Sequence, residues 1–185
     1  MLKACARLLL RVGGWEAIGG IPDAPKAVVI AAPHTSNWDG FWALVYKVSI
    51  GMDIHFFAKQ SLFWFPLGKL LRGLGGIPLD RSRATSAVAQ AVAMFDASTG
   101  FYFGLAPEGT RALRDGWKTG FHRIATEAGV PVYLGVLDYK TKRIGIADRL
   151  DLSGDTDADL RKCEDFYSKV VGRWPERTSP VRFVE

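Results

Sequence analysis

Apolar and polar positions show two distinct patterns along this chain, short apolar runs and longer segments with helical spacing. Short apolar runs bounded by glycine, proline or polar residues are typical of buried strands. Such runs predict strands at residues 27–32, 54–59, 76–79, 101–105, 131–137 and 143–146. Longer segments with capping residues or helical spacing predict helices at residues 37–49, 61–72, 84–97, 119–128 and 156–172. Because strands and helices alternate, we expect an α/β fold, formed by residues 1–185 as a single domain, in which helices flank a mixed and mostly buried sheet.

The N-terminal segment carries a further amphipathic pattern. Lys3, Arg7 and Arg11 recur every four residues and would share one side of a helix. The opposite side would hold apolar residues, namely Leu2, Cys5, Leu9 and Val12. This pattern suits a helix within residues 1–15 that lies in a membrane interface, or equally a helix that packs on the protein's own core. No window reaches the roughly 20 apolar residues that are needed to span a bilayer.

Composition and charge narrow the class of partner. The chain has 185 residues, of which 48% are hydrophobic and 23% charged, as in ordinary globular domains. The net charge of +5 favours anionic partners such as acidic lipid headgroups or phosphorylated substrates. Nucleic acid is not expected as a partner, because no helix-turn-helix, RNA-binding or zinc-binding pattern occurs. The two cysteines, Cys5 and Cys163, predict neither a disulfide framework nor a metal site, and a reducing cytoplasm is the expected location.

The first candidate for chemistry follows the first predicted strand. Pro33 disfavours helix at Ala32, so the chain is expected to bend here from strand to helix. His34 then lies in the bend and Asp39 in the first helical turn, where its carboxylate could hold one nitrogen of the imidazole. A surface histidine and an aspartate that favours a helix N-terminus would give the same two residues.

Two further candidates also follow predicted strands. Residues 107–111 read Pro-Glu-Gly-Thr-Arg, in which glycine permits a tight turn and Arg111 offers a bidentate donor for phosphate or carboxylate. Residues 76–81 read Gly-Ile-Pro-Leu-Asp-Arg and also end in an arginine, Arg81. Ordinary polar or basic loops remain the alternative for both segments.

Taken together and in this order, the segments resemble the motifs of the glycerolipid acyltransferase family. His34 to Asp39 matches its H-x-x-x-x-D block, and Pro107 to Arg111 matches its P-E-G-T-R block in full. Gly76 to Arg81 is similar to the family's second block, and Val130 to Leu134 to its fourth. The Ala58–Lys59 pair is similar to one that follows the family's second strand.

The resemblance implies a mechanism and a set of site residues. His34 would be the general base, and Asp39 would orient its ring and stabilise the imidazolium. Arg81 and Arg111 would hold the phosphate of the acceptor. The loop around Arg111 would be shaped by Glu108, Gly109 and Thr110, and Lys59 would attract an acidic donor or merely cover a strand end. No metal or other cofactor is implied.

The implied substrates are an acyl thioester and a membrane lipid. The acyl group would come from acyl-CoA or acyl-carrier protein and pass to the hydroxyl of a lysophospholipid, with 1-acylglycerol-3-phosphate as the first expectation. A lyso-ornithine lipid or a glycolipid is an alternative acceptor. A non-catalytic lipid-binding protein is an alternative of another class. The enzyme is expected to associate peripherally with the anionic inner face of the cytoplasmic membrane.

Overall fold

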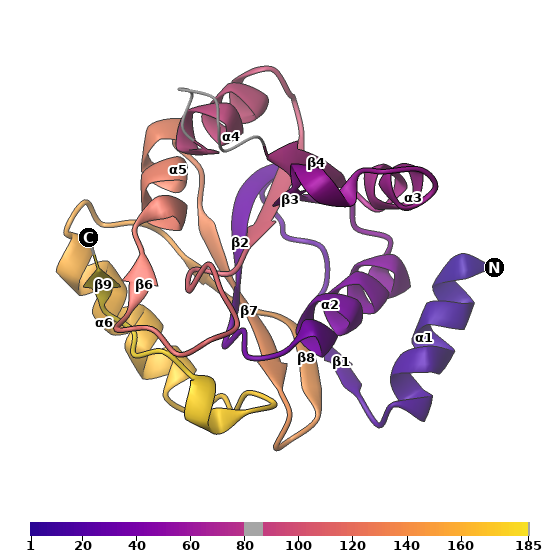
Figure 1. Ribbon diagram of the computed structural model, residues 1–185. Coiled ribbons are helices and arrows are strands. Elements are labelled where there is room, and N and C mark those ends of the chain that lie inside the picture. The colour runs from indigo at the N-terminus through magenta and orange to yellow at the C-terminus, as the bar shows by residue number, and fades with distance from the viewer. Residues whose placement is uncertain (80–86, 185) are drawn as a thin grey trace.

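A computed structural model describes residues 1–79 and 87–184 (Figure 1). Its centre is a seven-stranded sheet with the strand order β1-β8-β7-β2-β5-β3-β4. The strands are β1 (Glu16–Ile18), β2 (Lys26–Ala32), β3 (Ile54–Lys59), β4 (Gly76–Leu79), β5 (Phe101–Leu105), β7 (Val132–Asp138) and β8 (Arg143–Leu150). Neighbouring strands are parallel except for β7 and β8, which form an antiparallel pair. The expected mixed sheet of an α/β fold is therefore confirmed.

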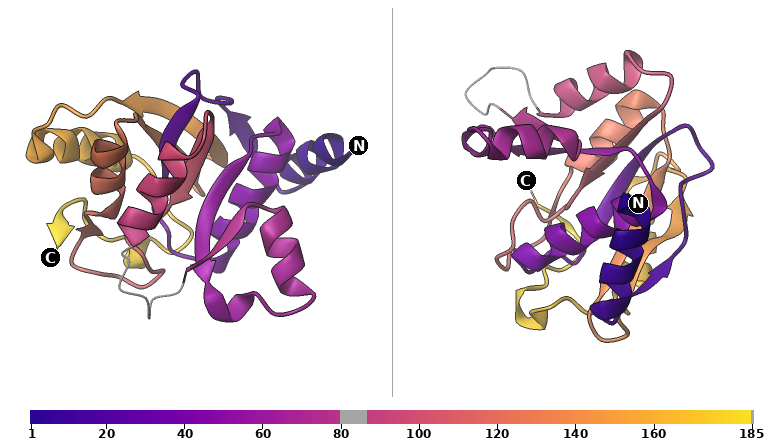
Figure 2. Two further views of the ribbon diagram at one scale, coloured as in Figure 1. Left: turned by 90° about the horizontal axis from the view of Figure 1, so that it is seen from above. Right: turned by 90° about the vertical axis from the view of Figure 1, so that its right-hand side faces the viewer.

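The helices cover both faces of this sheet. They are α1 (Leu2–Val12), α2 (Asn37–Ile50), α3 (Leu67–Gly73), α4 (Ala87–Asp96), α5 (Gly120–Ala128) and α6 (Thr156–Tyr167), with short 3-10 turns η1 (Gln60–Leu62) and η2 (Pro175–Arg177). A small second sheet pairs β6 (Trp117–Lys118) with β9 (Phe183–Val184). Figures 1 and 2 show α1 beside α2 on one side of the main sheet, with α5 and α6 on the other.

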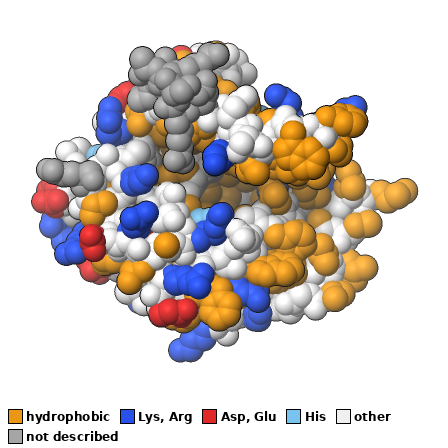
Figure 3. Space-filling view, viewed as in Figure 1, with side chains coloured by type: hydrophobic (Ala, Val, Ile, Leu, Met, Phe, Trp, Pro, Cys, Tyr) orange, Lys and Arg blue, Asp and Glu red, His pale blue; other side chains and the backbone are white. Residues whose placement is uncertain are grey.

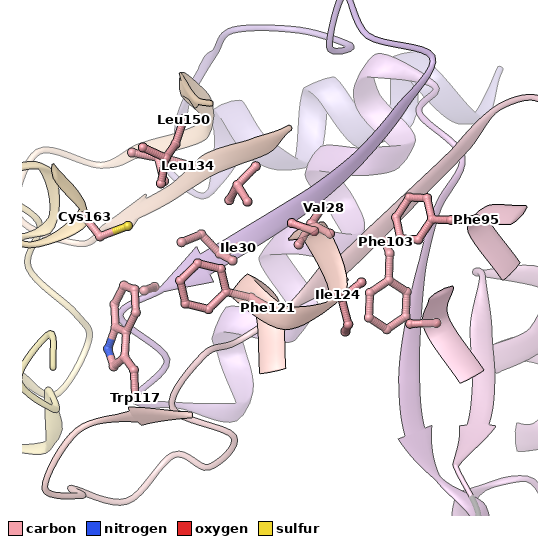
Figure 4. Packing of buried hydrophobic residues seen from close by; sticks show 14 of the residues in the cluster. Val28, Ile30, Phe95, Phe103, Trp117, Phe121, Ile124, Leu134, Leu150 and Cys163 are labelled. Carbon is pink, nitrogen blue, oxygen red and sulfur yellow. The ribbon is translucent and has the colours of Figure 1, made fainter. Parts of the chain in front are cut away.

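Residues on β2 explain why both faces are covered. Val28 and Ile30 point into one core with Phe103 of β5 and Phe121 of α5 (Figure 4). The alternate residues of β2, among them Val29, enter a second core with residues of α1 and α2. Because successive side chains of a strand point to opposite faces, an uninterrupted apolar run marks a strand that is buried on both sides.

The structure corrects several predicted boundaries. The sequence missed β1 and the small sheet of β6 and β9, which are all short. The helix expected at 61–72 is split into η1 and α3, with a break before Leu67. The last helix ends at Tyr167 rather than at 172, because Val171 instead bonds to the end of β7: its N–H donates to the side-chain Oδ1 of Asp138, and its carbonyl accepts from the N–H of Tyr139.

Helix α1 packs on the protein's own core, which is one of the two interpretations of the N-terminal segment. Its buried residues are Ala6 and Leu10, and Leu10 belongs to the same core cluster as Tyr46 of α2. Arg7 donates from Nε to the carbonyl of Ser49 at 3.1 Å, near the C-terminal end of α2. Leu9 and Val12 remain exposed. Among the residues that the structure describes, no helix is long and apolar enough to cross a membrane.

Candidate active site

The predicted catalytic residues meet at the carboxyl edge of the sheet. Strands β2 and β5 are parallel neighbours, with Ile30 opposite Leu105, so the loops that follow them emerge side by side. The first loop carries His34 and leads into α2, and the second carries Glu108. The backbone N–H of His34 donates to Oε1 of Glu108 at 2.9 Å, which joins the two loops directly.

His34 and Asp39 form the expected pair. Nδ1 of His34 lies 3.3 Å from Oδ2 of Asp39. With the Nδ1 proton directed at the carboxylate, Nε2 keeps a free lone pair, which is the arrangement a general base requires. The side chain of His34 is 21% exposed and that of Asp39 only 5%, so a substrate reaches the histidine rather than the carboxylate.

The start of α2 holds Asp39 in place. Ser36 is the N-cap, and its hydroxyl accepts from the backbone of Trp38 while its own N–H donates to Asp39, forming a capping box. Oδ2 of Asp39 accepts from the N–H groups of Thr35 at 2.7 Å and Ser36 at 2.8 Å. The same carboxylate therefore caps the helix and orients the histidine.

Tyr139 completes the shell of Asp39 and was not predicted from the sequence. Its hydroxyl donates to Oδ1 of Asp39 at 2.8 Å. Burial disfavours the charged form of Asp39, but the hydrogen bonds from His34, the Ser36 backbone and Tyr139 outweigh it, so the pKa of Asp39 is lowered. Burial raises the pKa of Tyr139, and the hydrogen bond to the Asp39 carboxylate raises it further. The hydroxyl of Tyr139 therefore keeps its proton and donates it to this hydrogen bond.

Glu108 is also buried, but it accepts fewer hydrogen bonds from the described residues than Asp39 does. It is 3% exposed, and its Oε2 atom has no hydrogen-bond partner among the described residues. Burial raises the pKa of Glu108, opposed only in part by the hydrogen bond from the backbone of His34. The geometry makes Glu108 a link between the two loops.

The rest of the P-E-G-T-R segment turns towards solvent. Gly109 adopts a φ of 65°, a left-handed conformation that side chains disfavour. The hydroxyl of Thr110 accepts from the N–H of Ala112 at 3.3 Å and so tightens the turn. Arg111 is exposed and makes no ion pair with a described residue, which leaves its guanidinium available for a ligand.

The remaining predicted site residues differ in what can be said of them. Lys59 ends β3 and lies, exposed, on the wall of the cavity described below. Arg81 lies outside the described residues. His122 of α5 pairs with the buried Asp159 at 3.3 Å and takes no part in the candidate site. No cluster of three or more possible metal ligands occurs in the described ranges.

A cavity of about 650 Å³ opens beside the histidine. His34, Asp39, Gly109 and Arg111 line its polar part. Its other walls are mainly apolar side chains from α2, β3, β5 and α5, including Leu44, Phe57, Phe103 and Ile124. Figure 3 shows hydrophobic side chains over α2 and α3 on one side of the hollowed surface and several Lys and Arg side chains on the other. Thus His34 lies where an apolar chamber meets a basic rim.

Comparison with known proteins agrees with this arrangement. The family model described as Acyltransferase matches residues 18–134, which include both loops and the strands before them. The chain belongs to the acyltransferase family. The acyltransferase is therefore an enzyme, and the resemblance of its motifs is confirmed.

One solved structure supports the fold of the acyltransferase. The crystal structure of the 1-acyl-sn-glycerophosphate (LPA) acyltransferase PlsC from Thermotoga maritima is similar with a TM-score of 0.63 and 22% sequence identity. The similarity covers 88% of this chain and 73% of that one. No curated protein matches the sequence. Tyr139 and the segment after α6 lie beyond the matched family region.

Proposed function

We propose that this acyltransferase moves a fatty acyl group from acyl-CoA or acyl-carrier protein to the hydroxyl of a lysophospholipid, with 1-acylglycerol-3-phosphate as the substrate. The observation that carries the proposal is the His34–Asp39 pair at the mouth of the cavity. Its volume of about 650 Å³ lies within the roughly 300–1,000 Å³ typical of small-molecule sites. Its apolar walls suit an acyl chain.

The proposed reaction is direct transfer. Nε2 of His34 accepts the proton of the acceptor hydroxyl as the oxygen attacks the thioester carbonyl. A carbon–oxygen bond forms, the carbon–sulfur bond breaks, and the proton passes from His34 to the departing thiolate. Asp39, which stays ionised because its pKa is lowered, stabilises the imidazolium between these steps.

The proposed binding roles are those that the resemblance to the family implies. Arg111, with Arg81 as its expected companion, holds the acceptor phosphate through bidentate hydrogen bonds. Glu108, Gly109 and Thr110 shape the loop that carries Arg111. Lys59, on the cavity wall, attracts the acidic donor. No step needs a metal ion or another cofactor.

The experiment that tests the proposal follows free thiol and lipid product together. The purified enzyme is given palmitoyl-CoA and a panel of lysolipids: lysophosphatidate, lysophosphatidylcholine, a lyso-ornithine lipid and a monoacylated glycolipid. Mass spectrometry should detect phosphatidate as the principal product, with thiol release in equal amount. Faster acylation of the ornithine lipid or the glycolipid would show that this lipid, rather than lysophosphatidate, is the acceptor. Thiol release without any acylated lipid would reject the transfer.

We also propose that the enzyme binds peripherally to an anionic membrane surface through α1 and the neighbouring aromatic turn. The outer side of α1 exposes Leu2, Leu9 and Val12. The segment formed by η1 and α3 exposes Trp64 at 59% and Phe65 at 83%, beside the basic Lys69 and Arg72. Such apolar side chains with nearby cations suit the interface of an anionic bilayer.

The membrane proposal is tested with surface variants rather than a truncation, because removing residues 1–15 would also remove the buried Leu10 and Trp15. One variant replaces Leu2, Leu9 and Val12 with serine, and a second replaces Trp64 and Phe65. A control replaces the exposed Leu113, on another loop. Sedimentation with phosphatidylglycerol liposomes should fall for the first two variants and not for the control. Equal pelleting of all three would reject this surface.

A further inference from the structure

The segment after α6 is fixed against the candidate site although it lies outside the matched family region. Val171 donates its N–H to Asp138 at 3.2 Å, and Trp174 donates its N–H to Oγ1 of Thr35 at 3.2 Å. Farther along, the hydroxyl of Ser179 accepts from the backbone of Arg114 at 3.0 Å. The residues between these anchors therefore have a defined position on the rim of the site.

Arg173, between the first two anchors, lies next to the catalytic pair. Its guanidinium carbon is 5.5 Å from the centre of the Trp38 ring and 6.0 Å from that of Tyr139. Tyr139 donates to Asp39, so a single side chain separates the Arg173 guanidinium from the Asp39 carboxylate.

Arg177 adds a second positive charge, which lies beside the P-E-G-T-R loop. It lines a surface hollow of about 470 Å³ together with Arg111 and Thr110. The ring of Trp174 contacts both arginines of the segment, at 5.7 Å from Arg173 and 5.8 Å from Arg177. Arg173, Arg177 and Arg111 thus follow one another along one rim.

No carboxylate among the described residues neutralises these three guanidinium groups. None makes an ion pair within 4.0 Å with any residue in the described part of the chain, and no carboxylate lines the hollow. Like charges gathered without counter-charges create a positive field that attracts anions. Planar guanidinium groups bind phosphate bidentately, and they can do so while they lie near an aromatic ring.

We propose that Arg173 and Arg177 are phosphate ligands of the enzyme, acting together with Arg111. The proposal rests on the proposed acyl transfer, because a lysolipid headgroup and CoA are the two phosphate-bearing substrates that reach this rim. The segment that carries both arginines thereby becomes part of substrate recognition, beyond the family motifs.

The test uses Arg173→Gln and Arg177→Gln, with Arg161→Gln on the exposed side of α6 as the matched control. Each protein is assayed with lysophosphatidate or monoacylglycerol as acceptor and with acyl-CoA or acyl-pantetheine as donor. Loss of a charge-assisted bond should raise KM for the phosphate-bearing partner about 10-fold or more, with a smaller change in kcat. A loss confined to lysophosphatidate places the acceptor here, and one confined to acyl-CoA places the donor. Equal losses on all four combinations, or losses no greater than in Arg161→Gln, overturn the proposal.

Binding without turnover separates this inference from the proposed function. Calorimetry with a short-chain lysophosphatidate and with CoA requires no reaction. Weaker binding by both variants, in an enzyme that acylates none of the acceptors, would keep the phosphate site and reject the function. Normal transfer by variants whose binding is unchanged would keep the proposed function and reject the phosphate site. Because Arg173 also lies against three aromatic rings, thermal unfolding is recorded for each variant, and Arg177→Gln alone decides if Arg173→Gln lowers Tm.

Discussion

Asp39 and Glu108 are two carboxylic acids with equal burial and opposite electrostatics. Both follow neighbouring parallel strands, and they are 4% and 3% exposed. Asp39 accepts hydrogen bonds from two backbone N–H groups and from Tyr139, and it faces His34, so its pKa is lowered. Glu108 accepts one bond from a neighbouring backbone and has an oxygen without a described partner, so burial raises its pKa.

The difference teaches that hydrogen bonds, rather than burial, decide in which direction the pKa of each carboxylate moves. Desolvation acts on both groups in the same direction. Only Asp39 has enough donors to overcome it. Asp39 is thereby suited to stabilise a positive imidazolium, whereas Glu108 is suited to hold two loops together.

The largest effect is expected at His34, the group that Asp39 serves. His34→Ala should lower transfer by roughly 10²- to 10⁴-fold, the usual contribution of a positioned general base. The fold should survive, because Glu108 is bonded to the backbone rather than to the ring of His34. Asn37→Ala, at the exposed first position of α2, is the control and should retain transfer. Near-normal thiol release by a well-folded His34→Ala enzyme would show that His34 is not the general base.

Asp39→Asn should cost less, about 10- to 100-fold in transfer, because charged hydrogen bonds contribute roughly 1.5–3 kcal/mol. It should also destabilise the fold in a pH-dependent way. The folded pKa of Asp39 is below its ordinary value of 3.8, so the carboxylate stabilises the fold above that value. This contribution is lost as the pH falls through the folded pKa. Urea unfolding of both proteins from neutral to acid pH should show curves that converge in acid; a constant gap would argue against a charged Asp39.

Tyr139→Phe should have a smaller effect, about 5-fold, the equivalent of roughly 1 kcal/mol for one net hydrogen bond. Removal of this donor should raise the pKa of Asp39, so the pH at which the fold loses the contribution of this carboxylate should move upward. Loss of packing alone would lower stability by the same amount at every pH. Urea unfolding across the acid range therefore distinguishes a positioning residue from a packing residue.

Glu108→Gln should change transfer least, because the amide oxygen of glutamine can still accept from the backbone of His34. Its effect on stability should have the opposite sign to that of Asp39→Asn. The folded pKa of Glu108 is raised, so the wild-type protein loses stability as the pH rises through that pKa. The glutamine variant lacks this loss and should gain relative stability between acid and neutral pH. Denaturant midpoints that keep the same difference at every pH would show that Glu108 titrates normally.

The sequence predicted the long strands and helices because their patterns are local. The run around Val28 is apolar on both faces, and Gly129 ends α5 in a left-handed conformation, as expected of a C-terminal cap. Short elements such as β1 and β6 have too few residues to show a period. They exist because parallel partners far along the chain, at β8 and β9, supply their hydrogen bonds.

The same division applies to the site. His34 and Asp39 are four residues apart within one motif, and the turn that pairs them depends on Pro33 and the Ser36 cap beside them. Tyr139 is 100 residues from Asp39, and no feature of its own surroundings in the sequence marks it. The sequence after residue 172 is basic and contains proline, but this pattern does not indicate where the segment docks.

The sequence by itself determined the strand–helix alternation, the His34–Asp39 pair and the P-E-G-T-R turn, since each depends on backbone preferences and side chains within a few residues. Only the tertiary structure decided the electrostatics: the donors on Asp39, the Glu108 oxygen that has no partner among the described residues, and the rim of arginines beside them. The physical reason is that a group's charge depends on its desolvation and its hydrogen-bond partners. Those partners come from β7, β5 and the segment after α6, which lie close together only when the sheet is complete.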